Sequence, residues 1–62
     1  MLRAPLLTVH DVAEKLQVKE STVRDWINKR HLRAVRFGRE WRIAVKDLEK
    51  FLNDRANIAD AG

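Results

Sequence analysis

Apolar residues recur at helical spacing in three stretches of this 62-residue chain and at strand spacing in one. An apolar stripe at i, i+3, i+4 and i+7 predicts an amphipathic helix. The first stripe predicts a helix over residues 9–17, the second a helix that ends near Arg30, and the third a helix over residues 45–53. The stripes consist of Val9, Val12, Ala13 and Leu16, then Val23, Trp26 and Ile27, then Val45, Leu48, Phe51 and Leu52.

Between the second and third helices the period changes to two, which is typical of a half-buried β-hairpin. Gly38-Arg39 is the expected turn, because glycine tolerates a positive φ. We expect the apolar residues on the inner face and Arg36 and Arg42 on the outer face, with Arg39 at the tip. A hairpin that only closes the core accounts for the same pattern. The alternating residues are Val35, Arg36, Phe37, Glu40, Trp41, Arg42 and Ile43.

The two ends of the chain lack these patterns. Residues 1–6 are expected to form an N-terminal arm, since Pro5 excludes a regular helix there. Thr8 is a good helix N-cap, and Asp11 three residues later suggests a variant of the capping box. Residues 54–62 are small and polar, so we expect a disordered tail. The pattern as a whole predicts one mainly α domain over residues 1–62, with a small β-hairpin between its second and third helices.

The composition argues against several classes of protein. Cysteine is absent, so no disulfide or cysteine-ligated zinc can stabilise the fold. No apolar run approaches the ~20 residues of a membrane span, and the N-terminus is too broken for a signal peptide. Tyrosine is absent, the lone Ser21 has no oriented histidine beside it, and no acidic cluster has metal-ligand spacing. We expect a cytoplasmic protein without membrane partner, enzymatic activity, catalytic residues, metal or cofactor.

The net charge of +4 is unevenly distributed. Residues 19–46 hold nine lysines and arginines against three acidic residues, a net of +6, whereas residues 47–62 carry −2. Such a concentration is the expected footprint of a nucleic-acid-binding surface. Most of these residues are arginines, which suit bidentate contacts with phosphates and bases. A solvated basic face is the alternative, but the pattern favours double-stranded DNA as the partner.

The second helix carries the residues best suited to reading DNA. At about 100° per residue, Ser21, Asp25 and Asn28 point away from the apolar stripe, and Arg24 lies on its flank. Asparagine can pair with adenine, and arginine with guanine or phosphate, in the major groove. A plain amphipathic helix with a solvated outer face remains the alternative. The candidate DNA-binding residues are Ser21, Thr22, Arg24, Asp25, Asn28 and Lys29 on the helix, and Arg36, Arg39 and Arg42 on the hairpin.

Several motifs follow one another in order along residues 6–53: Leu7-Thr8-Val9, Val12-Ala13-Glu14-Lys15-Leu16, Val18, Ser21-Thr22-Val23-Arg24-Asp25-Trp26-Ile27, Ala34 to Ile43, and Asp47 to Leu52. This ordered set resembles the excisionase-like winged helix-turn-helix domains, which are related in fold to the DNA-binding domain of MerR regulators. The resemblance implies three helices with a two-stranded wing between helices 2 and 3. It also implies that the second helix reads the major groove and that the wing touches backbone or minor groove. Thr22-Val23-Arg24 is similar to the Thr-Ile-Arg run of MerR proteins, whose arginine contacts DNA.

Three positions depart from the family pattern, which usually has glycine at 17, a capping serine at 19 and glycine at 30. Gln17 is expected to be strained if the turn requires a positive φ. Without a serine at 19, we expect the second helix to start later, with Ser21 as its cap. Arg30 suggests a helix end closed without a left-handed glycine.

The resemblance implies a non-enzymatic, sequence-specific protein that bends attachment-site DNA and assists an integrase in excising a mobile element. A small MerR-like transcriptional regulator is the alternative, and a protein-interaction module without DNA binding is a weaker one. We expect a monomer in solution that loads cooperatively onto repeated sites. We assign Trp26 and Trp41 to the core rather than to base stacking.

Overall fold

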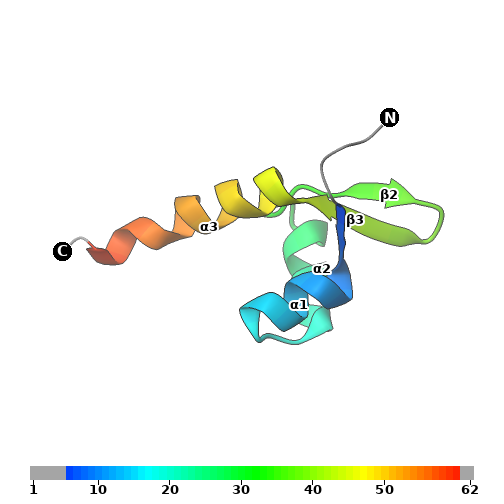
Figure 1. The fold of residues 1–62 in the computed structure, drawn as a ribbon, viewed down its shortest axis with the longest axis horizontal. Coiled ribbons are helices and arrows are strands. Elements are labelled where there is room, and N and C mark those ends of the chain that lie inside the picture. Colours follow the sequence, from blue (N-terminus) through cyan, green and yellow to red (C-terminus); the bar gives the residue numbers. More distant parts are fainter. Residues whose placement is uncertain (1–5, 61–62) are drawn as a thin grey trace.

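A computed structural model describes residues 6–60, and it describes side chains as far as Ala56. Three helices surround a small three-stranded antiparallel sheet (Figure 1), which confirms the expected fold class. The elements in chain order are β1 (Leu6–Thr8), α1 (Val9–Leu16), α2 (Glu20–Asn28), β2 (Val35–Phe37), β3 (Glu40–Ala44) and α3 (Val45–Asp60). The arm was expected over residues 1–6: its residues 1–5, with Pro5, lie outside the described residues, and Leu6 is the first residue of β1.

The first strand, β1, was not expected from the sequence. It pairs antiparallel with β3, so the sheet has the order β1-β3-β2. Leu7 lies opposite Ile43 in this pairing, and Ile43 is fully buried. Three residues are too few to show an alternating pattern, and the strand exists because β3 offers it a free edge. The chain therefore enters the domain as part of the wing's sheet rather than as a loose arm.

The hairpin turns at Gly38 as expected, and Gly38 has φ 63. The distribution of residues over the two faces of the hairpin differs from the expectation. Residues directly opposite each other share a face, and the two-residue turn pairs odd-numbered positions with even-numbered ones. Val35 and Phe37 therefore lie away from the core and are 43% and 51% exposed. Arg36 and Arg42, expected on one outer face, lie on opposite faces. The pairs are Val35–Arg42, Arg36–Trp41 and Phe37–Glu40.

Helix α1 begins with the expected cap. The Thr8 hydroxyl accepts a hydrogen bond from the Asp11 backbone N–H at 2.9 Å, and the Thr8 N–H donates to the Asp11 carboxylate at 3.1 Å. The helix ends at Leu16, and the capping residue Gln17 takes the left-handed conformation with φ 57. This confirms the strain expected there, which costs roughly 1–2 kcal/mol for a residue other than glycine.

Helix α2 begins and ends differently from the expectation. Glu20 is its first residue, and Lys19 occupies the N-cap position without a side-chain hydrogen bond, so the expected cap at Ser21 is wrong. The helix ends at Asn28, and Arg30 adopts φ 64. The left-handed conformation expected of a glycine at this end is thus taken by an arginine. The backbone N–H of His31 then closes the end on the Trp26 carbonyl at 2.8 Å.

Nine apolar residues form the buried core, and they come from all three helices, β3 and the loop after α2. Both tryptophans pack against this core without being fully buried, which confirms their assignment. The Trp26 ring lies 4.9 Å from the Phe51 ring of α3. The core residues are Val9, Val12, Ala13, Val23, Ile27, Leu32, Ile43, Leu48 and Phe51.

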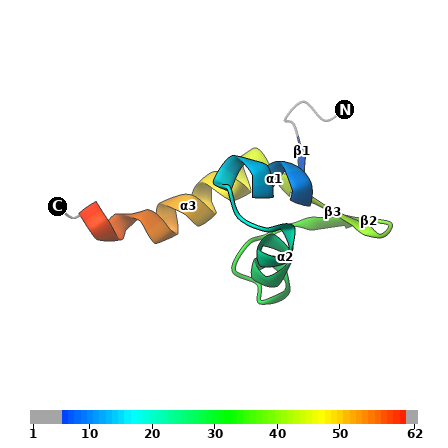
Figure 2. The ribbon, with the colours of Figure 1, turned by 90° about the horizontal axis from the view of Figure 1, so that it is seen from below.

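Helix α3 is longer than expected, because it continues to Asp60 instead of ending at residue 53. Its first turns bury Leu48 and Phe51, and the rest runs away from the other elements (Figure 2). Residues 54–60, expected in a disordered tail, lie in this helix. Within residues 6–60, no helix is long and apolar enough to cross a membrane.

Candidate nucleic-acid interface

The outer face of α2 carries most of the candidate residues. Val23 and Ile27 hold the helix on the core, so the opposite side is turned to solvent. Ser21, Arg24, Asp25, Asn28 and Lys29 are all exposed, as the helical spacing predicted, whereas Thr22 is half-buried. The helix therefore presents a narrow polar ridge.

Some of these residues form ion pairs along α2, namely Arg24, Asp25 and Lys29, and the others do not. Arg24 lies 3.3 Å from Glu20, and Lys29 lies 3.2 Å from Asp25, both at i, i+4 spacing. Such exposed pairs contribute little to stability, so their members can exchange them for other partners. The Asn28 amide has no side-chain hydrogen bond to any described residue. The Ser21 hydroxyl has none either, so Asn28 and Ser21 are the members of the ridge whose donors and acceptors are open to a ligand, and the Asn28 amide is the one that can pair with a base through two hydrogen bonds.

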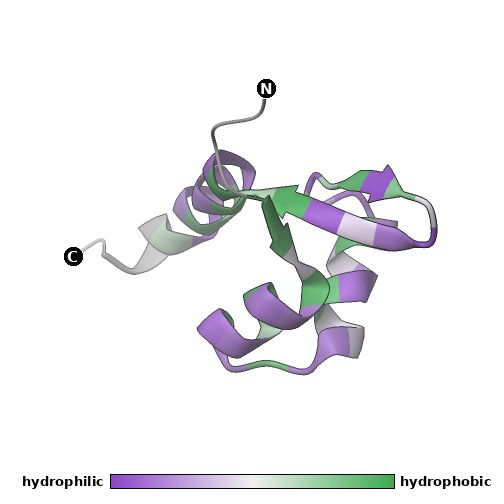
Figure 3. Ribbon diagram, turned by 45° about the vertical axis from the view of Figure 1, so that its right-hand side comes forward, coloured by the Kyte–Doolittle hydropathy of each residue, from purple (hydrophilic) through white to green (hydrophobic). Residues whose placement is uncertain are grey.

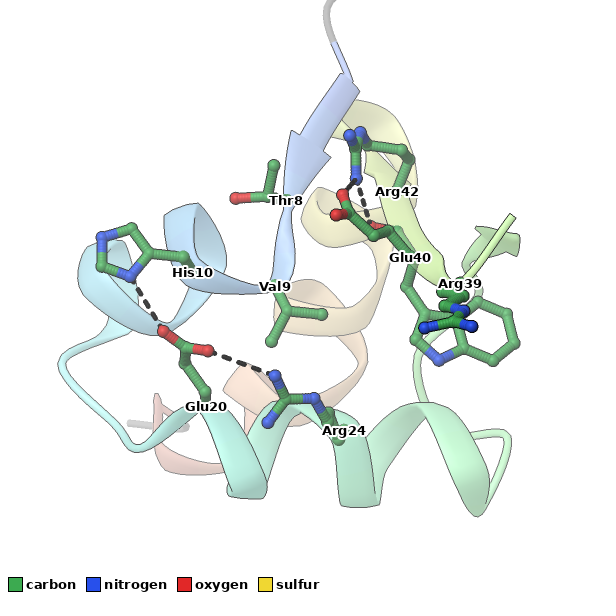
Figure 4. Close-up of a pocket in the computed structure, with 9 residues that line it drawn as sticks. Thr8, Val9, His10, Glu20, Arg24, Arg39, Glu40 and Arg42 are labelled. Atoms are coloured by element: carbon green, nitrogen blue, oxygen red, sulfur yellow. Dashed lines mark hydrogen bonds and ion pairs between the residues drawn. The ribbon is translucent and has the colours of Figure 1, made fainter. Parts of the chain in front are cut away.

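His10 joins this surface although the sequence assigned it no role. Its Nδ1 lies 2.9 Å from Oε2 of Glu20 (Figure 4). Its Nε2 lies 3.9 Å from Oε1 of Glu14. The hydrogen bond with Glu20 raises the pKa of His10, and the charge of Glu14 adds to this. The same hydrogen bond lowers the pKa of Glu20. Ten residues separate His10 from Glu20, so helical spacing could not have revealed the contact.

The three arginines of the hairpin point in three directions rather than forming one face. Arg36 lies 5.3 Å over the Trp41 ring and donates to the Gly38 carbonyl at 3.2 Å. Arg42 lies on the opposite face, half-buried, and pairs with Glu40 at 2.9 Å. Arg39 sits in the turn between the strands. The alternation of hydrophobic and hydrophilic residues along both strands is visible in Figure 3.

Two hollows flank α2, and they differ in charge. The first, about 250 Å³, lies between α2, the start of α1 and β3 (Figure 4). Three of its four basic residues contact an acid, since Glu20 contacts both His10 and Arg24, and Glu40 contacts Arg42, whereas Arg39 is in none of the ion pairs of the described residues. Its lining residues are Thr8, Val9, His10, Glu20, Arg24, Arg39, Glu40, Trp41 and Arg42.

The second hollow, about 400 Å³, lies between the end of α2, the loop that follows it and β3. We call it the loop groove. It contains two arginines and no acidic residue. Its lining residues are Ile27, Asn28, Arg30, Leu32, Arg33, Ala34 and Trp41. Neither Arg30 nor Arg33 was among the candidate residues from the sequence, because both fall between the two patterned elements.

Two helices joined by a tight turn, followed by a basic hairpin, define a winged helix-turn-helix domain. A scan against protein families agrees: the model of the helix-turn-helix domain matches residues 6–56. The chain belongs to this family, a class of DNA-binding domain that is typically not enzymatic. DNA is accordingly the partner that the fold indicates. Searches of curated proteins and of solved structures gave no significant match.

Proposed function

We propose that the protein binds double-stranded DNA sequence-specifically, with α2 in the major groove and the hairpin on the adjacent backbone or minor groove. The observation that carries this proposal is Asn28, which lies on the exposed ridge of α2 beside the arginines of the loop groove and makes no side-chain hydrogen bond within the described part of the chain. A major groove about 12 Å wide admits one α-helix. The small or short side chains of Ser21 and Asn28 allow the close approach that base contacts require.

The roles of the helix residues differ in this proposal. Asn28 pairs with an adenine edge through its amide. Arg24 exchanges Glu20 for a phosphate or a guanine, and Lys29 exchanges Asp25 for a phosphate. The Asp25 carboxylate then accepts a hydrogen bond from the amino group of a cytosine or keeps its ion pair with Lys29. Ser21 and Thr22 contact the sugar-phosphate backbone, and on the wing Arg36, Arg39 and Arg42 supply positive charge near it.

The finer function we propose is that of an excisionase, which bends attachment-site DNA and assists an integrase. What supports it is the ordered resemblance over residues 6–53. One winged domain covers only about 600–1,000 Å² of protein surface on DNA, so a single site is held modestly. We therefore propose a monomer that binds adjacent repeats cooperatively. A transcriptional regulator that fills one operator is the alternative, and binding isotherms on one site against three tandem sites separate the two.

The experiment that tests the reading role is Asn28→Ala measured against a panel of single-base variants of the selected site. If Asn28 pairs with one base, the variant loses about 1–3 kcal/mol on the preferred site and no longer distinguishes variants at that position. Asn53→Ala is the matched control, because Asn53 is exposed on α3. Equal weakening on every site would show that Asn28 reads no base.

A further inference from the structure

The loop that lines the loop groove is held in one conformation. Four consecutive backbone N–H groups, from Lys29 to Leu32, donate to carbonyls of α2 over 2.8–3.2 Å. Leu32 is 1% exposed and anchors the loop in the core. Arg30 and Arg33, on either side of this anchor, are thus presented from a rigid backbone. A ligand that binds them need not order the loop.

Arg30 is one of two described non-glycine residues with positive φ. A glycine would adopt φ 64 without cost, whereas a Cβ makes this conformation unfavourable. Residues held in such conformations cluster at functional sites. The arginine therefore carries a backbone strain that a glycine at this position would relieve.

The charge of the loop groove is uncompensated in the described part of the chain. None of the ion pairs there involves Arg30, Arg33 or the neighbouring Arg36. Arg36 lies over the Trp41 ring, and Trp41 lines the groove. The hollow on the other side of α2 differs, since two acids line it and contact three of its four basic residues, His10, Arg24 and Arg42. An anion is therefore favoured in the loop groove.

Asn28 belongs both to the reading ridge of α2 and to the lining of the loop groove. A duplex with a base edge at Asn28 has its sugar-phosphate backbone beside that base. The carbonyls of Asp25, Trp26 and Ile27, which would otherwise repel an anion at this helix end, already accept backbone hydrogen bonds. The groove therefore meets the backbone of DNA bound to α2.

We propose that Arg30 and Arg33 bind a backbone phosphate of DNA in the loop groove, on the α2 side of the wing. This rests on the proposed function and extends it, because it states on which side of α2 the DNA backbone runs. Binding there is independent of base sequence, since phosphates carry no sequence information.

The test compares Arg30→Gly with Gln17→Gly, because both replace a left-handed residue by glycine and only the first removes a charge. Both variants should raise the melting temperature by several degrees. Arg30→Gly alone should weaken binding to every duplex, about five- to tenfold at 0.1 M salt, and flatten the plot of log K against log salt by about one unit. Gln17→Gly should bind as the wild type does.

Arg33→Gln supplies a second variant with the natural backbone, and Lys50→Gln on α3 removes the same charge elsewhere. Arg33→Gln should flatten the slope by about one unit and Lys50→Gln should leave it unchanged. Wild-type slopes for both arginine variants would overturn the phosphate site while leaving DNA binding intact. A wild-type protein that binds no duplex at low salt would instead overturn the proposed function and this site with it.

Discussion

The start of α2 has no side-chain cap, and contacts of the Glu20 side chain stabilise it instead. Glu20 is the first residue of the helix and receives His10 from α1 on one oxygen and Arg24 on the other (Figure 4). At the start of α1, the Thr8 backbone N–H and then its hydroxyl lower the pKa of Asp11. Both acids lie in first turns, where negative charge complements the helix dipole.

A pH titration tests the contact between His10 and Glu20. Because the pKa of His10 is raised in the folded chain, the pair adds stability below the unfolded pKa of 6.5, and this is lost as pH rises through the folded pKa. In an NMR titration, Glu20→Gln should lower the pKa of His10 toward its ordinary value. Glu14→Gln should lower it less, because Glu14 lies 3.9 Å away. An unchanged pKa in Glu20→Gln would refute the contact.

At the scale of elements, the hairpin is where the structure departs furthest from the sequence pattern. Its turn was predicted correctly, but a two-residue turn pairs odd with even positions, so the apolar residues of β2 and β3 lie on opposite faces. The wing thus offers DNA a tip and two unlike faces. Of the three arginines in the wing, Arg36 lies over the Trp41 ring and Arg42 pairs with Glu40. Arg39, in the turn, is in neither of these contacts.

The contribution of the wing is tested by neutralising its tip. Arg39→Gln should flatten the salt dependence of binding by about one unit and leave sequence preference intact, as expected for a phosphate contact. Arg39→Lys keeps the charge and should keep the slope. If the slope in Arg39→Gln equals that of the wild type, the tip does not contact DNA.

The predictable parts of the fold are those set by local patterns. The stripes and the Thr8 cap located α1 and α2 to within about two residues, because helix periodicity is a local property. Strand β1 could not be foreseen, since it depends on a partner edge far along the chain. The end of α3 was missed because small polar residues after Asn53 carry no stripe.

The candidate site divides in the same way. The exposure of Arg24 and Asn28 followed from the spacing along one helix. The contact of His10 with Glu20 and the meeting of Arg30 and Arg33 in one groove depend on packing between elements. Neither leaves a periodic signal in the sequence.

The whole molecule is small and unevenly charged, because seven of its thirteen lysines and arginines lie between the start of α2 and the end of β3. Helix α3 buries Leu48 and Phe51 in the core, and the rest of the helix leads away from this region (Figure 1). In the proposed complex, the binding free energy therefore comes mainly from electrostatic contact between one side of the domain and the DNA backbone, and α2 adds the base contacts. Such binding releases counterions, and its strength must fall with salt.

The most direct test is the affinity of the wild-type protein for a short labelled duplex over a salt series, measured by fluorescence anisotropy. With about five to six cations on phosphates, log K should fall linearly with log salt at a slope near −5. Binding that is absent at 50 mM salt, or unchanged between about 50 and 200 mM, would contradict the account.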